Sequence, residues 1–440
     1  MEIFIKIVQL LLSLSILVIF HEFGHFIAAR LFKTRVEKFY LFFDPWFSLF
    51  KFKKGDTEYG VGWVPLGGYV KISGMIDESM DKEQMKLPPQ PWEFRSKPAW
   101  QRLIIMLGGV TVNVLLAIVI YICMLSMWGE QYLPTTEVKY GISVDSLGYR
   151  MGLRDGDRIV TIDHRQVEDF AAIPKTIILE EAKSVQVVRN GENIDVPVPA
   201  GFISQLIKQK TPDFIAVRFP FEAGKFAPGS PAKTAGMQIG DKIIGLNDSL
   251  RIYFDQFRAS IQHYKNKTVK VMVVRGKDTL RLPVSVPAAG LIGVYHKAPV
   301  TYFKFKEKSY NFITAIPVGV VKAFDGAGNY IKSIKLLFSQ EKAYESVGGF
   351  ITIGNIFPST WDWPAFWSLT AFLSIMLGVL NILPIPALDG GHVMFLFYEI
   401  IFRRKPSDKF MEYAQVVGMV ILFGLLIFAN GQDIMKLFRH

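Results

Sequence analysis

Two histidines and a glutamate, spaced as in a zinc site, lie inside a long apolar segment of this 440-residue chain. His21, Glu22 and His25 fall within the apolar run from residue 3 to residue 32. A spacing of four places the two histidines on one face of a helix, where they can share a Zn²⁺ ion and leave Glu22 free as a general base. Ionisable groups in a membrane-length helix are costly unless protein or water surrounds them, so this cluster indicates function.

A zinc ion held by two histidines needs another protein ligand, and the third apolar run offers one. Asp389 follows Pro384 and Pro386, which break the run. Broken helices at membrane depth are tolerated where their backbone lines a site or cavity. His392 is a rival ligand, and Asp389 could instead serve only as the N-cap of a helix that begins there. We favour Asp389, because a break in a helix that faces the first run suits a third ligand.

The composition predicts a membrane protein with a polar insert. Half of the residues are hydrophobic, mean hydropathy is +0.26, and the chain has 50 Lys and Arg against 39 Asp and Glu. The basic excess is spread along the chain, which favours a cytoplasmic membrane flank over nucleic-acid binding. The single Cys123 excludes a thiolate metal cage, so zinc must use His and carboxylate ligands. The first run continues into the histidine motif, so we expect a retained helix rather than a cleaved signal.

Four apolar runs are long enough to cross a bilayer, and their flanks predict an orientation. The runs cover residues 3–32, 103–128, 367–388 and 411–430. A shorter run at 392–402 should dip into the membrane or extend a helix. Lys and Arg gather after the first run and again at 403–405, which places both loops in the cytoplasm. The termini and the insert should then face the periplasm of a bacterium, with the histidines nearer the cytoplasmic face.

The insert at residues 129–297 contains an internal repeat. Gly152 and Asp157 in the first copy recur as Gly236 and Asp241, 84 residues later. The pattern resembles a pair of PDZ domains, at 129–213 and 214–298, although another β-rich insert is an alternative. No clear carboxylate-binding loop is recognisable in either copy, so screening of bulky substrates is at least as well supported as peptide capture.

The motifs together resemble the site-2 protease family of intramembrane zinc metalloproteases, and most closely its bacterial branch that cleaves anti-sigma factors. The resemblance covers nearly the whole chain. The family's HExxH motif is present at residues 21–25, and its Asn-x-x-Pro-x-Pro-x-Leu-Asp-Gly motif is complete at residues 381–390. The roles that the resemblance implies are zinc ligation by His21, His25 and Asp389, base catalysis by Glu22, and binding of the substrate backbone by Asn381.

Further family features are present with changes. The family's Gly-Pro-x-x-Asn keeps its Asn as Asn113 but has Val110 in place of Pro, so Asn113 either assists the site or only bonds between helices. The family's Ser-Gly-Pro-Ile is replaced at residues 347–350. Residues 58–71 match the family's membrane re-entrant β-hairpin, although an ordinary surface hairpin is an alternative. The candidate substrate contacts in this hairpin are Gly67, Gly68 and Tyr69.

The predicted fold is a polytopic α-helical membrane protein with about four transmembrane helices, a re-entrant β-hairpin and an inserted pair of PDZ-like α+β domains. Its membrane core should comprise residues 1–128 and 351–440. Residues 299–350 mix apolar and charged residues at helical intervals. We expect amphipathic membrane-proximal helices that brace the insert, and the alternative is surface helices with no such role.

The expected activity is zinc-dependent hydrolysis of peptide bonds within single-pass transmembrane proteins in the lipid bilayer. The resemblance suggests anti-sigma factors and leftover signal peptides as substrates, and leaves open whether an upstream site-1-type protease must cut first. Two other interpretations are a catalytically silent membrane scaffold and a zinc transporter. A scaffold has no need for a buried base at Glu22, and a transporter would line a path with polar residues rather than gather them in one cluster.

Overall fold

The computed structural model describes residues 1–75, 87–209, 214–341 and 343–438. Within these residues, four helices are long and apolar enough to cross a membrane, and each matches one predicted run. They are α1 (Glu2–Leu31), α3 (Ala99–Trp128), α11 (Trp363–Asn381) and α13 (Asp408–Phe438). The chain divides into two compact units, residues 1–129, 309–338 and 344–440 in one, and 130–308 with 339–343 in the other. The expected combination of membrane helices and a β-rich insert is confirmed.

The third membrane helix ends earlier than its apolar run. The run was predicted to reach residue 388, but α11 ends at Asn381 and a turn follows. Pro384 and Pro386 cannot donate a backbone hydrogen bond and disfavour helical geometry in the residue before them, which accounts for the break. The chain becomes helical again in α12 (Asp389–Phe402), which begins three residues before the short segment predicted at 392–402.

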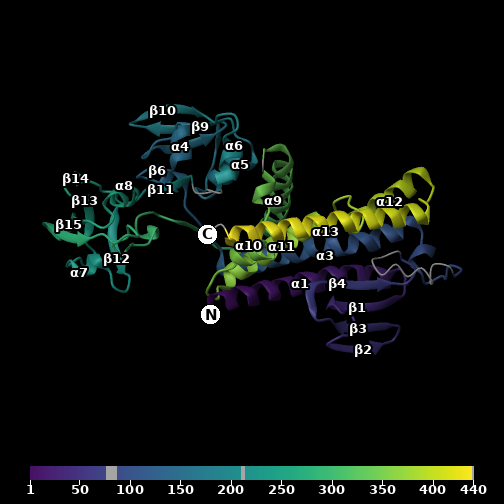
Figure 1. The fold of residues 1–440 in the computed structure, drawn as a ribbon. Coiled ribbons are helices and arrows are strands. Elements are labelled where there is room, and N and C mark those ends of the chain that lie inside the picture. The colour runs from purple at the N-terminus through teal and green to yellow at the C-terminus, as the bar shows by residue number, and fades with distance from the viewer. Residues whose placement is uncertain (76–86, 210–213, 342, 439–440) are drawn as a thin grey trace. The chain divides into compact units, whose positions relative to one another are not determined.

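A glycine contact brings α1 and α3 together at the level of the histidines. A Cβ atom on Gly24 would lie 2.2 Å from the backbone oxygen of Gly108, so a larger residue would force the helices apart. The two helices run side by side in Figure 1. Close backbone approach through small residues is a common means of association between membrane helices. The contact places the second helix directly against the predicted metal-binding face of the first.

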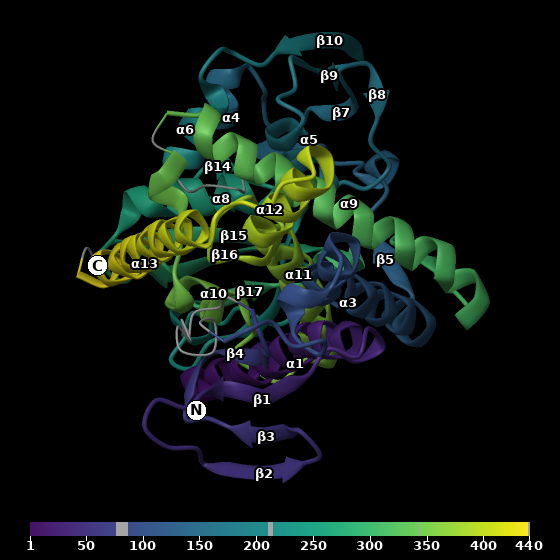
Figure 2. The same cartoon turned by 90° about the vertical axis from the view of Figure 1, so that its right-hand side faces the viewer.

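A four-stranded sheet lies against α1, with β4 nearest to the helix and β2 farthest from it (Figure 2). The strand order is β2-β3-β1-β4. β1 pairs in parallel with β3 and antiparallel with β4. The strands are β1 (Val36–Phe43), β2 (Phe50–Lys54), β3 (Thr57–Val61) and β4 (Val64–Ile72).

The hairpin predicted at residues 58–71 is therefore wrong in its pairing. β3 and β4 flank β1 instead of bonding to each other, and the two residues that join them cross the end of β1. The backbone N–H of Gly62 donates to Leu41 O during this crossing. A Cβ atom on Gly62 would lie 2.1 Å from Phe43 O, so the crossing requires glycine. Alternating residues predict strands, but they do not reveal which strand lies between two others.

The insert repeats one arrangement of strands and short helices, called here the first copy and the second copy. In each copy, a strand ahead of the first helix pairs with the last strand, as β6 does with β11 and β12 does with β17. Because β11 pairs with β6, the first copy extends a few residues past the boundary predicted after residue 213. The first copy contains β6 (Ile142–Val144), α4 (Ser146–Met151), β7 (Arg158–Ile162), β8 (Arg165–Gln166), α5 (Ala172–Leu179), β9 (Ser184–Arg189), β10 (Glu192–Pro197), α6 (Phe202–Gln209) and β11 (Ile215–Val217).

The second copy is followed by a return to the membrane unit. Its elements are β12 (Phe221–Phe226), α7 (Pro231–Thr234), β13 (Lys242–Leu246), β14 (Ser249–Leu250), α8 (Phe254–Ile261), β15 (Thr268–Arg275), β16 (Asp278–Ser285) and β17 (Val294–His296). β18 (Lys306–Lys308) then pairs with β5 (Glu130–Tyr132), which joins the two ends of the insert. Each copy has its own buried apolar cluster, centred on residues such as Ile177 and Val271.

The predicted amphipathic region contains one long helix, α9 (Phe312–Ser339), and a short one, α10 (Phe350–Ile356). α9 packs its small residues Ala315 and Ala323 against α3, while Ile313 and Phe324 on the same helix stay exposed. The helix crosses the membrane helices steeply in Figure 1. This direction is consistent with a helix that lies along a membrane surface.

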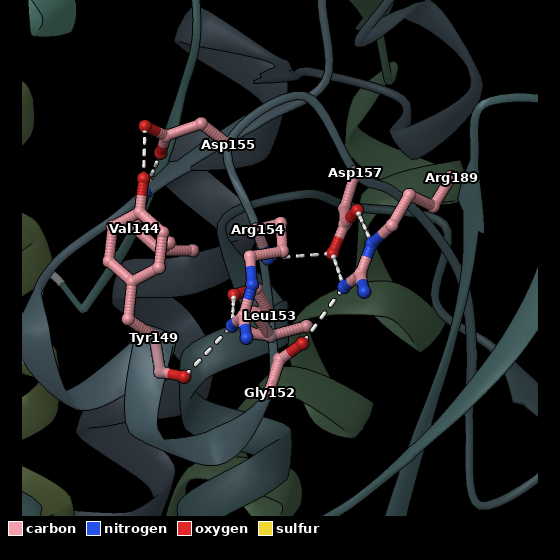
Figure 3. Close-up of polar contacts among 8 residues, drawn as sticks. All are labelled: Val144, Tyr149, Gly152, Leu153, Arg154, Asp155, Asp157 and Arg189. Atoms are coloured by element: carbon pink, nitrogen blue, oxygen red, sulfur yellow. Dashed lines mark hydrogen bonds and ion pairs between the residues drawn. The ribbon is translucent and has the colours of Figure 1, made fainter.

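An ion pair in the first copy joins the turn after α4 to strand β9 (Figure 3). The guanidinium of Arg189 donates to both carboxylate oxygens of Asp157, each at 2.7 Å, and to Gly152 O at 2.8 Å. The same carboxylate accepts from the backbone N–H of Arg154. Because Asp157 is fully buried, this fork supplies the partners that its charge requires.

The second copy has the same network. Arg275 donates to both oxygens of Asp241 at 2.8 and 2.7 Å and to Gly236 O at 2.8 Å. Asp241 also accepts from the backbone N–H of Gln238. The hydrogen bonds from Arg275 hold the pKa of the Asp241 carboxyl below its usual value. The aspartate found in the sequence repeat, Asp157 or Asp241, therefore accepts the same set of hydrogen bonds in both copies.

Replacing Arg275 with Met should loosen the second copy alone. The variant leaves the buried Asp241 without its charged partner, and amide exchange in β13 and β15 should accelerate about tenfold or more at neutral pH. Hydrogen–deuterium exchange on the full-length protein in detergent measures this, with β7 and β9 of the first copy as the internal control. The pKa of Asp241 is lowered by folding, so the difference from the parent should shrink as the pH falls through that value. Equal acceleration in both copies would contradict independent networks.

Candidate metal centre

Three side chains from two elements converge on one point inside the membrane unit. The Nε2 atoms of His21 and His25 on α1 lie 3.2 and 3.3 Å from Asp389 Oδ2, at the first residue of α12. The two Nε2 atoms are 3.3 Å apart. The predicted third ligand therefore lies with the histidine pair, although more than 360 residues separate them in the sequence.

The trio fits a zinc ion in both geometry and chemistry. A tetrahedral ion about 2.0–2.1 Å from each ligand requires ligand atoms about 3.3 Å apart, which is the spacing observed among these three atoms. Asp389 Oδ2 is buried and has no hydrogen-bond partner within the described residues. A buried anionic oxygen beside two imidazole nitrogens is satisfied by a shared cation.

The rival ligand His392 lies elsewhere in the site. It lines the same cavity as the trio, three residues further along α12. The group of close potential ligands in the described part of the chain contains His21, His25 and Asp389. The N-cap interpretation of Asp389 is not needed to explain its position, because its side chain turns towards the histidines.

Backbone and amide groups orient the two imidazoles. His25 Nδ1 lies 2.9 Å from Ile105 O on α3, so Nδ1–H donates to that carbonyl and the lone pair of Nε2 faces the trio. Asn113, also on α3, places its amide 3.2 Å from His21 Nδ1. The Asn113 Oδ1 atom is buried without a partner among the described residues. Turning the amide by 180° lets Oδ1 accept from His21 Nδ1–H, which satisfies both groups.

Asn113 thus makes the interhelical contact that the sequence left open, and its partner is His21, a candidate metal ligand. Ser374 on α11 donates to Asn113 O at 2.8 Å, which fixes α11 against the same turn of α3. Asn381, at the end of α11, has its amide nitrogen 3.1 Å from His21 Nε2. Both predicted asparagines therefore lie next to one histidine, one on each of its ring nitrogens.

A cavity of about 610 Å³ opens beside the trio. Its walls include Glu22, the strand β4 and two residues of α13, Gln415 and Leu422. β4 is the last strand of its sheet, so its backbone edge towards this cavity has no strand partner within the described residues. A Cβ atom on Gly68 would meet Val18 at 2.6 Å, so this glycine lets β4 approach α1 next to Glu22.

The predicted substrate contacts on β4 differ in their roles. Gly67 and Gly68 line the cavity with their backbone. Tyr69 also lines the cavity, and its side chain supports the sheet by donating its hydroxyl to Asp44 at 2.8 Å and stacking on Tyr40. Gln415 was not predicted, and the signal that could have found it is a lone amide in an otherwise apolar turn of α13.

Comparisons with known proteins agree with this geometry. Residues 9–425 match peptidase family M50. Proteins named "Putative zinc metalloprotease" from Rickettsia conorii and Vibrio cholerae are each 27% identical, over 99% and 98% of this chain and 99% and 98% of their own length. The regulator of sigma E protease of Haemophilus influenzae is 25% identical over 97% of this chain and 98% of its own.

Zinc affinity should fall in graded steps when these residues are replaced. Removing a ligand, as in His21→Ala, His25→Ala or Asp389→Ala, should abolish stoichiometric zinc, because two ligands hold it far more weakly than three. Asn113→Leu should weaken binding about 10- to 100-fold by releasing His21. Glu22→Gln should keep parental affinity, since Glu22 is assigned no bond to the metal. Competition with a chromogenic chelator measures each value, and parental affinity in Asp389→Ala would contradict the ligand set.

Proposed function

Because this chain belongs to peptidase family M50, we propose that it hydrolyses peptide bonds inside the transmembrane segments of single-pass membrane proteins. Family membership and the names of the relatives identify a zinc metalloprotease. The observation that carries the proposal is the placement of His21, Glu22 and His25 within a helix of membrane length, beside a cavity with an open strand edge. A protease built for soluble substrates has no need of such a location.

Glu22 is the proposed general base. Zinc, when bound, acidifies a coordinated water and polarises the scissile carbonyl. Glu22 takes a proton from the attacking water as its oxygen bonds to the carbonyl carbon, and then passes that proton to the nitrogen as the C–N bond breaks. The Glu22 side chain lies on the cavity wall next to β4, close to Gly68.

The open edge of β4 supports a role in holding the substrate. A transmembrane helix hides its carbonyl groups in its own hydrogen bonds, so a segment must unwind before hydrolysis. An unwound segment can add to β4 as a further strand, as peptides do at other sheet edges. Asn381, beside His21 on the same cavity, is positioned to bind the substrate backbone. Residues that break helices should therefore make a segment easier to cut.

The proposed substrate class is supported by the family and by one named relative. A relative of this chain is the regulator of sigma E protease of Haemophilus influenzae. Anti-sigma factors and leftover signal peptides, which are single-pass or single-segment membrane substrates, are the proposed targets. We place the protein in the bacterial inner membrane with both termini in the periplasm, an orientation that thiol labelling of engineered cysteines from each side can test.

The two copies of the insert are proposed to be PDZ-like domains that screen or dock substrates. Their matching Asp–Arg networks and strand pairings support a tandem repeat of one fold. If they screen by size, the full-length protein should cut a reporter with a short ectodomain faster than one with a bulky folded ectodomain. A protein with residues 130–308 replaced by a short linker should cut the two at similar rates. Discrimination that persists without the insert would contradict a filter.

Cleavage of a tagged single-pass reporter by purified protein in detergent tests the activity. The parent should release product, and Glu22→Gln should be about 10²- to 10⁴-fold slower because the base is lost while the metal remains. Among reporters, a Gly-Pro pair near the cut should speed cleavage, and a Leu- and Ala-rich segment should slow it. Parental rates in Glu22→Gln would place the base elsewhere, and equal rates on both reporters would count against local unwinding.

A further inference from the structure

The membrane helix α13 attaches to the rest of its unit through an unusual set of buried residues. Its buried residues in the described part of the chain are Gln415, Gly418 and Asp433, and none of them is a large apolar residue. Apolar side chains such as Val420 and Ile427 stay largely exposed. The buried contacts of the helix are therefore concentrated at two points, Gln415 with Gly418 and Asp433, while its ring contacts with Phe395 and Tyr344 involve exposed side chains of the helix.

One of these points is the turn that carries Asp389. The side-chain oxygen of Gln415 accepts from the backbone N–H of Ala387 at 3.1 Å. One helical turn further, Gly418 passes so close to this turn that a Cβ atom there would lie 1.5 Å from Pro386 O. Gln415 itself is only 5% exposed, so its amide is committed to this contact.

The backbone N–H of Ala387 needs an acceptor from outside the turn. Ile385 and Leu388 donate their backbone N–H groups to carbonyls inside the turn, at 2.7 and 3.0 Å. The N–H of Ala387 instead bonds to Gln415. Ala387 also has a φ of +86°, a left-handed conformation that a residue with a side chain adopts at a cost. Such a conformation persists when its surroundings hold it, and Gln415 supplies that restraint two residues before the metal ligand.

We infer that Gln415 is a positioning residue for Asp389, and that the docking of α13 through this amide sets the affinity of the site for zinc. The inference rests on the proposed ligand role of Asp389. Without the Gln415 acceptor, Ala387 can leave its left-handed conformation, and the Asp389 carboxylate then loses the orientation that brings it within 3.3 Å of both histidines. The substrate cavity is lined by the same glutamine, so the helix that borders the cavity also supports the metal ligand.

A matched control exists on the same helix. At the second attachment point, Asn430 accepts from the backbone N–H of Phe350 at 3.2 Å, through a side-chain amide oxygen of the same kind. This contact fixes the start of α10 and touches no residue of the metal site. Asn430→Leu removes an equivalent bond from α13 and reports the general effect of loosening the helix.

The test compares Gln415→Met, Gln415→Glu and Asn430→Leu in the full-length protein. Gln415→Met keeps the side-chain length but removes the acceptor, and should weaken zinc binding about 10- to 100-fold in competition with a chromogenic chelator. Gln415→Glu keeps an acceptor oxygen and should bind zinc within a few fold of the parent. Asn430→Leu should bind zinc as the parent does. Amide exchange at residues 382–388 should accelerate in Gln415→Met alone, which separates loss of the turn from global unfolding.

The outcomes distinguish this inference from the site assignment. If Asp389→Ala weakens zinc binding and Gln415→Met does not, the positioning role is wrong while the ligand set stands. If Asp389→Ala binds zinc normally, the ligand set is wrong, and the positioning role inferred for Gln415 is wrong as well. Equal weakening in Gln415→Met and Asn430→Leu would also overturn the inference, because it would reflect loosening of α13 as a whole.

Discussion

The fold of the membrane unit depends on the need to keep two imidazoles and a carboxylate together inside apolar surroundings. A buried carboxylate oxygen without a hydrogen-bond donor is unfavourable alone, and Asp389 Oδ2 becomes acceptable only beside His21 and His25 with a shared cation. That requirement explains the close glycine contact between α1 and α3, since α3 supplies the carbonyl of Ile105 that orients His25. It also explains why α11 must break to deliver its ligand.

The break in α11 has its own consequences. A turn at membrane depth leaves backbone groups without helical hydrogen bonds, and these need partners from the protein or from a cavity. Part of this need is met within the turn, and Gln415 on α13 accepts from the N–H of Ala387. A helix that borders the cavity is thereby linked to Asp389, the candidate third ligand. The docking of α13 and the turn that carries Asp389 are then linked through one hydrogen bond.

The sequence predicted the local features well and the long-range ones unevenly. The spacing of His21 and His25, the four apolar runs and the proline break depend on neighbouring residues, and each is present in the structure. The pairing of β3 and β4 was mispredicted because strand order depends on which segment fills the gap between them, and β1 does. Gln415 was missed because nothing near it in sequence reveals a turn 28 residues away that needs an acceptor.

Zinc K-edge X-ray absorption on the purified, zinc-loaded protein tests the central claim most directly, because it reports the ligands themselves. Our account predicts two imidazole nitrogens and additional oxygen ligands at about 2.0–2.1 Å, with no sulfur. The Asp389→Ala protein should show a changed oxygen shell with both imidazoles retained. A spectrum with three imidazoles, which would place His392 on the metal in place of Asp389, would contradict the account.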